Sequence, residues 1–97
     1  MNIYKVERTD KWSYDDYDSF VCYANSPDEA RYIYPDDFYV WKDGSWQMKT
    51  IDDKWVSCTH PSWVIDPTKD LTITLCGFTD MVEEAPPGVI LASYNAG

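Results

Sequence analysis

A strand pattern that runs directly into a helix start constrains the fold more than any other feature of the sequence. Residues 19–24, Ser-Phe-Val-Cys-Tyr-Ala, are rich in β-branched and aromatic side chains, which favours a buried strand. Ser26 can cap the helix that follows, a proline takes the first helical position, and Glu29 completes a capping box. We expect a short helix up to about Tyr34, because Pro35 disfavours helical backbone at the residue before it.

Alternating apolar and polar side chains predict most of the other strands. The alternation covers residues 2–9 near the start of the chain and residues 71–78 further on. Residues 38–41 and 46–51 flank a Lys-Asp-Gly-Ser turn, which predicts a β-meander in the middle of the chain. Residues 89–93, Val-Ile-Leu-Ala-Ser, complete the set as a last strand.

Chain length and aromatic content define the expected architecture. Ninety-seven residues support a single domain, 1–97, and five Trp, eight Tyr and three Phe supply a core of large rings. Trp55 and Val56 fit either a further short strand or a loop that covers this core. We therefore expect an α+β fold, in which an antiparallel sheet of about five strands carries one short helix packed on one face.

The cysteines indicate a reducing compartment. Cys22, Cys58 and Cys76 are odd in number and widely spaced, and they include no Cys-x-x-Cys pair. The first ten residues lack the apolar segment of a signal peptide, and no apolar run approaches the roughly 18 residues that a membrane helix needs. We expect three free thiols and a protein that stays in the cytoplasm of the cell in which it acts.

Strong negative charge narrows the classes of partner. Seventeen acidic and eight basic side chains give a formal net charge of −9 at pH 7. A chain of this charge repels nucleic acid and anionic membranes, so we expect neither direct nucleic-acid binding nor membrane binding. The same field attracts basic protein surfaces. The alternative is that the charge serves only to keep the protein soluble.

Residues with catalytic potential are sparse. Cys58 and His60 place a thiol and an imidazole two residues apart, but no recognisable third group would orient the histidine. The aspartates of residues 10–18 lack the central glycine and terminal glutamate of a calcium loop, and phosphate-binding glycine motifs are absent. We expect no enzymatic activity, no catalytic residue, no cofactor and no metal site.

Carboxylates and aromatic rings gather in three groups that we predict to be the partner-binding residues. The first is a predicted exposed hairpin loop over residues 10–18, the second covers residues 28–37 at the edges of the predicted helix, and the third lies in the connection before the last strand. Carboxylates on exposed loops resemble a phosphate backbone, and exposed rings supply anchors. The alternative is that the charges are solvated and the rings belong to the core. The candidates are Asp10, Trp12, Tyr14, Asp15, Asp16, Tyr17, Asp18, Asp36, Asp37, Glu83 and Glu84.

Two segments carry a resemblance to a known group of proteins. DSFVCYANSPDEAR at 18–31 and GVILASYNAG at 88–97 resemble small proteins of bacteriophages and integrated elements, which share a Ser-x-x-Glu-Ala-Arg helix start and a similar C-terminal ending. The two segments cover 24 of the 97 residues. The resemblance implies a phage or mobile-element origin and assigns no active site. Small acidic phage proteins are similar in character to anti-CRISPRs and other inhibitors of host defence.

The functional hypothesis joins the charge pattern to this resemblance. We expect a phage-encoded, anti-CRISPR-like inhibitor that acts in the host cell cytoplasm. It would bind a basic surface, such as the nucleic-acid channel or a protein interface of a CRISPR-Cas effector subunit. The alternative is a phage structural or accessory protein without enzymatic activity, which binds another phage protein or self-associates, a homodimer included.

Overall fold

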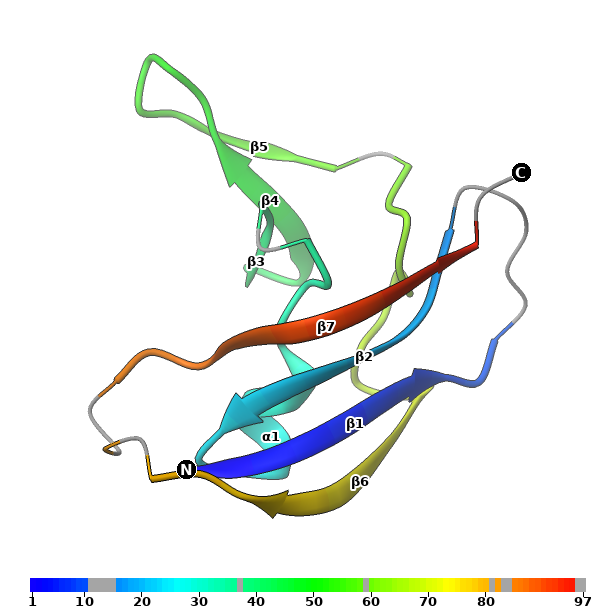
Figure 1. Ribbon diagram of the computed structural model, residues 1–97. Coiled ribbons are helices and arrows are strands. Elements are labelled where there is room, and N and C mark those ends of the chain that lie inside the picture. The colour runs from blue at the N-terminus through cyan, green and yellow to red at the C-terminus, as the bar shows by residue number, and fades with distance from the viewer. Residues whose placement is uncertain (11–15, 37, 59, 81, 83–84, 96–97) are drawn as a thin grey trace.

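The computed structural model describes residues 1–10, 16–36, 38–58, 60–80, 82 and 85–95 (Figure 1). Strands dominate this part of the chain, with one short helix inserted after the second strand. The elements are β1 Asn2–Arg8, β2 Asp16–Ala24, α1 Pro27–Arg31, β3 Val40–Lys42, β4 Ser45–Lys49, β5 Trp55–Ser57, β6 Leu71–Phe78 and β7 Gly88–Asn95.

The described strands form two antiparallel sheets. The larger has the order β6-β1-β2-β7, and the smaller has the order β3-β4-β5 and projects to one side of it (Figure 1). The expected single sheet of about five strands was therefore wrong, although one short helix does pack against the larger sheet. Asp43 and Gly44 both have positive φ, at 52° and 80°, as a two-residue hairpin turn requires. β3 and β4 pair through this turn, β4 pairs with β5 on its other side, and no described strand of the larger sheet pairs with them.

Strand β2 begins earlier than the sequence suggests. The predicted exposed loop over residues 10–18 was wrong for Asp16–Asp18, which belong to β2; Asp16 and Tyr17 pair with the end of β7. Asp18 is an extra residue in this ladder, because Tyr17 lies opposite Tyr94 and Ser19 lies opposite Ser93. A bulge of this kind accommodates a charged residue in a strand without placing it in the core.

The helix start is confirmed in detail. Ser26 has extended backbone, and its hydroxyl accepts a hydrogen bond from the backbone N–H of Glu29 at 3.1 Å. The Glu29 carboxylate in turn accepts from the backbone N–H of Asn25 at 2.9 Å. The helix ends at Arg31 rather than near Tyr34, because Ile33 forms an isolated antiparallel bridge with Val40. No helix in the described ranges is long and apolar enough to cross a membrane.

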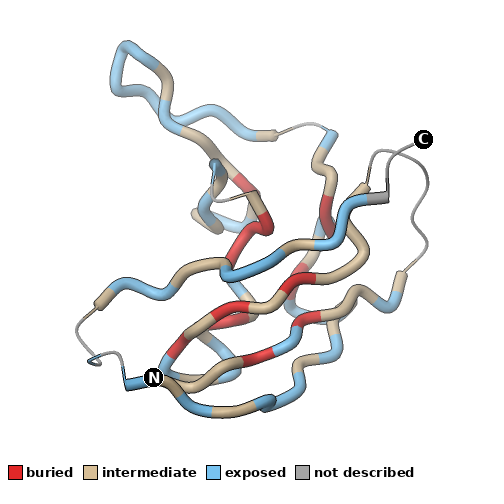
Figure 2. Tube along the Cα trace, in the orientation of Figure 1, coloured by how far each residue is buried: buried red, intermediate tan, exposed pale blue. Residues whose placement is uncertain are grey.

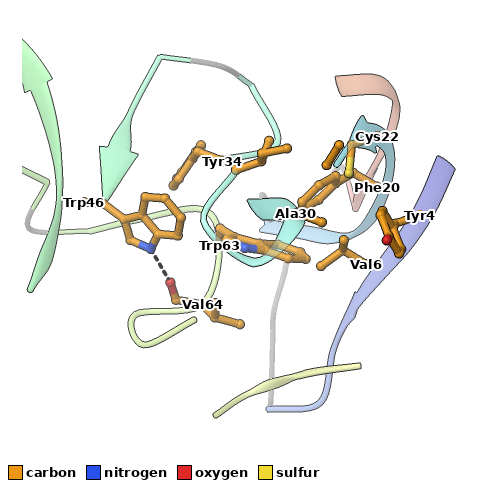
Figure 3. Packing of buried hydrophobic residues seen from close by; sticks show 11 residues of the cluster. Tyr4, Val6, Phe20, Cys22, Ala30, Tyr34, Trp46, Trp63 and Val64 are labelled. Carbon is orange, nitrogen blue, oxygen red and sulfur yellow. Dashed lines mark hydrogen bonds between the residues drawn. The ribbon is translucent and has the colours of Figure 1, made fainter. Parts of the chain in front are cut away.

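One face of the larger sheet carries the core. Buried residues alternate along β1 and β2, and they share one core cluster with α1 and with three aromatic rings from outside the sheet (Figures 2 and 3). Trp63 is 1% exposed and lies 5.1 Å from Phe20 between ring centroids, in an edge-to-face arrangement. Trp46 of β4 joins the same cluster, so a single core holds both sheets together. The buried cluster is Tyr4, Val6, Phe20, Cys22, Ala24, Ala30, Ile33, Tyr34, Trp46, Trp63 and Val64.

The segment over residues 61–67 runs beneath the sheet without regular structure and delivers Trp63 and Val64 to the core. Other parts of the fold satisfy its backbone groups. Four hydrogen bonds do so: Tyr17 N–H to Ser62 O at 2.8 Å, Ser62 N–H to Tyr34 Oη at 2.7 Å, Trp46 Nε1–H to Val64 O at 2.7 Å and Arg31 Nη1–H to Pro67 O at 2.8 Å. The core is thus assembled from contacts distant in the sequence.

Loss of the helix cap gives a first test of this fold. Ser26→Ala removes the hydroxyl that accepts the hydrogen bond from the Glu29 N–H, and we expect it to lower the free energy of unfolding by about 1 kcal/mol. Glu29→Ala should cost less, because it removes a hydrogen bond to an exposed N–H. Urea denaturation monitored by circular dichroism measures both. An equal loss on Asp28→Ala, an exposed residue of the same turn, would contradict the capping role.

Thiol reactivity gives a second test. All three cysteines are thiols rather than disulfide partners, as the sequence predicts; Cys76 is exposed, Cys58 is half-buried and Cys22 is buried. Native protein should react with Ellman's reagent quickly at Cys76, more slowly at Cys58 and at Cys22 only in denaturant. Rapid reaction of Cys22 in native protein would contradict its place in the core.

Candidate partner-binding surface

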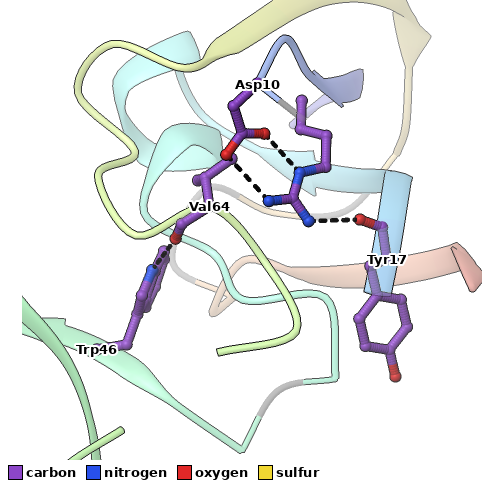
Figure 4. A network of polar contacts seen from close by, with 5 residues as sticks. Asp10, Tyr17, Trp46 and Val64 are labelled. Atoms are coloured by element: carbon purple, nitrogen blue, oxygen red, sulfur yellow. Dashed lines mark hydrogen bonds and ion pairs between the residues drawn. The ribbon is translucent and has the colours of Figure 1, made fainter. Parts of the chain in front are cut away.

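Asp10 is committed to an ion pair inside the fold. The Arg8 guanidinium donates to its carboxylate through Nε at 2.6 Å and Nη2 at 3.0 Å, and donates to the carbonyl of Tyr17 through Nη1 at 3.2 Å (Figure 4). The same guanidinium lies 5.7 Å from the ring centroid of Trp63. Only 6% of the Arg8 side chain is exposed, so Asp10 neutralises a nearly buried charge. Its main role is therefore structural.

Tyr17 packs into the fold instead of projecting from a loop. Its ring meets the ring of Tyr94 edge to face, at 4.9 Å between centroids, and it packs against the core cluster. Burial raises the pKa of the Tyr17 hydroxyl, and the negative charge of Asp36 raises it further. The structure thus brings Asp36 of the second acidic group near Tyr17 of the first. Asp36 itself accepts a hydrogen bond from the backbone N–H of Phe38 at 3.0 Å.

Asp18 lies at the bulge of β2 and not in an exposed acidic loop. Its carboxylate accepts a hydrogen bond from the Ser19 hydroxyl at 3.0 Å, and the bulge sets it at the rim of an open pocket of about 260 Å³. Glu7, Ser19 and Ser93 lie side by side across β1, β2 and β7 and line the same pocket. Arg8 lines it as well, with its guanidinium charge already engaged by Asp10. The pocket therefore presents two carboxylates and two hydroxyls.

The pocket opens on the side of the larger sheet that faces away from the core. Cross-strand register places Glu7 opposite Ser19, whereas the buried Val6 lies opposite the buried Phe20. Among the described helices and strands, only α1 packs against this sheet, and it does so on the core side. The acidic pocket is thus accessible to a large partner.

Sequence reasoning found part of this surface. It named Asp18, which lines the pocket, but it missed Glu7, Ser19 and Ser93; Asp16 also lies on β2 but does not line the pocket. Alternation along residues 2–9 marks Glu7 as outward-facing, but no local signal reveals that Ser93 lies beside Ser19. The remaining candidates, Trp12, Tyr14, Asp15, Asp37, Glu83 and Glu84, lie outside the described residues.

Cys58 and His60 do not share a recognisable site. Cys58 is half-buried against the core, and a hydrogen bond with its thiol raises the pKa of Tyr39. It also lines a small pocket of about 100 Å³ together with Trp46 and Pro61, whereas His60 is exposed and is not part of that lining. Within the described ranges, no three His, Cys, Asp or Glu side chains are grouped so as to hold a metal ion.

Substitution of Asp10 and of Asp18 should change the free energy of unfolding by different amounts. Asp10→Ala leaves the nearly buried Arg8 charge without its carboxylate, and we expect it to lower the free energy of unfolding by about 2 kcal/mol. Asp18→Ala removes only a half-exposed carboxylate, so its effect should stay within about 0.5 kcal/mol. Thermal and urea denaturation measure both. Equal losses would contradict the distinction between a structural and a surface-presented aspartate.

Comparison of the chain with models of protein families, with curated proteins and with solved structures found no match.

Proposed function

We propose that this protein is a phage-encoded, anti-CRISPR-like inhibitor of a host defence system, and that it acts in the host cytoplasm by binding a basic surface of the effector complex. The observation that carries the proposal is the acidic pocket on the outer side of the larger sheet. It presents the Glu7 and Asp18 carboxylates and the hydroxyls of Ser19 and Ser93 from three neighbouring strands. Side chains on paired strands are held more rigidly than side chains on a loop.

The chemistry of the pocket suits a cationic side chain. Carboxylates and hydroxyls accept the N–H groups of arginine or lysine, and a pocket of about 260 Å³ has room for one such side chain. Glu7 forms a partly exposed ion pair with Lys5 at 3.6 Å, which a stronger partner can displace. Arginines that hold the phosphates of a guide or target strand have the donors that this pocket accepts.

Charge distribution favours binding of a basic partner outside the smaller sheet. The segment 40–57, which forms the smaller sheet, contains three lysines and three aspartates. The whole net charge of −9 therefore falls on the rest of the chain, which includes the larger sheet. A field of one sign accelerates association with a basic surface, and salt weakens it over a Debye length of about 10 Å at 0.1 M.

Charge reversal at the pocket tests the proposal. Asp18→Lys should weaken binding to the effector complex by about tenfold or more, since a cation then faces the basic partner. The measurement is competition with target DNA for purified CRISPR-Cas effector complexes carrying guide RNA, followed by mobility shift. Inhibition by the wild type should also decline as salt rises from about 50 to 200 mM.

Asp52→Lys is the matched control. It changes the net charge by the same amount, and Asp52 is exposed in the turn between β4 and β5, away from the pocket. It should inhibit nearly as well as the wild type. If the wild type inhibits none of the effector types, the proposal is overturned. If Asp18→Lys and Asp52→Lys lose inhibition equally, the pocket is not part of the interface.

A further inference from the structure

The outer edge of β6 is not paired with any other described strand. β6 ends the order of the larger sheet and pairs with β1 on one side, and no other described strand pairs with it. Its eight residues, Leu71–Phe78, include no charged residue and no proline. Charges, prolines and bulges are the usual means by which soluble proteins prevent an edge strand from pairing with another chain. The edge therefore offers backbone donors and acceptors to an incoming strand.

The opposite edge of the sheet is less regular. β7 is also uncharged, but its ladder with β2 shifts register twice, and Pro86 and Pro87 directly precede it. By contrast, β6 pairs with β1 without interruption from Leu71 to Leu75, and its single shift comes after that stretch. A regular stretch accepts a new strand more readily than a bulged one, because bulges increase the local twist.

The regular stretch of β6 reads the same in both directions. Its sequence, Leu71-Thr72-Ile73-Thr74-Leu75, is a palindrome centred on Ile73. Two copies paired antiparallel around a two-fold axis at Ile73 place isoleucine opposite isoleucine. The same register places threonine opposite threonine and leucine opposite leucine. Matched β-branched and Thr–Thr pairs across strands stabilise sheets.

The exposure of individual side chains fits this pairing. Leu75 lies opposite Tyr4 and so belongs to the core-facing side, yet it is 52% exposed at the edge. In the two-fold arrangement, Leu71 of a second copy would lie opposite it and cover it. Thr72 and Thr74 are exposed on the other side, where the two copies would place them next to each other.

We propose that a second copy of this chain pairs antiparallel with β6 around Ile73, so that the two larger sheets form one continuous eight-stranded sheet. Such an interface is isologous, with the same strand contributed by both copies. The acidic pocket lies on β1, β2 and β7, so each copy keeps its own pocket accessible. The dimer does not depend on the proposed inhibition.

Salt separates the two proposals. Each copy carries a net charge of −9, so the copies repel one another at low salt, although the paired strands themselves are uncharged. Screening weakens this repulsion, and dimerisation should therefore become stronger between about 50 and 500 mM salt. Binding of a basic partner has the opposite salt dependence.

Sedimentation velocity of the full chain tests the dimer. Over about 1 to 200 µM, the weight-average mass should rise from one chain toward two, and the midpoint concentration should decrease with added salt. The Thr72→Glu/Thr74→Glu variant sets carboxylates opposite each other and should raise the dissociation constant at least about tenfold. The Thr72→Lys/Thr74→Lys variant should do the same. An equimolar mixture of the two variants should restore association, because opposite charges then meet across the axis.

The matched control is Ile90→Glu/Leu91→Glu, which adds the same charge at two exposed positions of β7 that do not line the acidic pocket. This control should dimerise like the wild type. Far-ultraviolet circular dichroism and melting temperature establish that all variants are folded. A wild type that stays monomeric at every concentration and salt would overturn the proposal. So would dissociation of the β7 control, or a variant mixture that fails to associate.

Discussion

Packing of Trp63 beneath the larger sheet is the contact on which the rest of the structure depends. Its ring meets Phe20 edge to face and lies under the Arg8 guanidinium. Its indole N–H is buried and has no acceptor among the described residues, which is unfavourable unless packing compensates. The irregular segment 61–67 holds Trp63 in place only because distant groups satisfy its backbone. Helix, hairpin and sheet are joined through this segment.

The buried Arg8 side chain explains why Asp10 lies within the fold while Asp18 faces solvent. A guanidinium this deeply buried requires a counter-ion, and Asp10 supplies it with good geometry. One carboxylate of the first acidic group is thereby committed to stability. Asp18, displaced by the bulge, lies instead on the solvent side with Glu7. The same short stretch of sequence thus serves both the core and the surface.

The two proposals use different parts of the same sheet. A basic partner would engage the acidic pocket on β1, β2 and β7, whereas self-association would use the uncharged edge at β6. One interaction is driven by charge and the other is opposed by it. A dimer that presents two pockets would bind a partner with repeated basic sites more tightly than one copy does, through higher effective concentration.

Local rules determined the elements of this protein, and long-range packing determined their arrangement. The Ser26 cap, the strand at 71–78 and the turn at Asp43-Gly44 could be read from the sequence, because capping, alternation and positive φ are properties of adjacent residues. The split into two sheets, the bulge at Asp18 and the meeting of Glu7 with Ser93 could not. They depend on which strands pair and in which register, and pairing is decided by burial of Trp46 and Trp63 against residues far away in the chain.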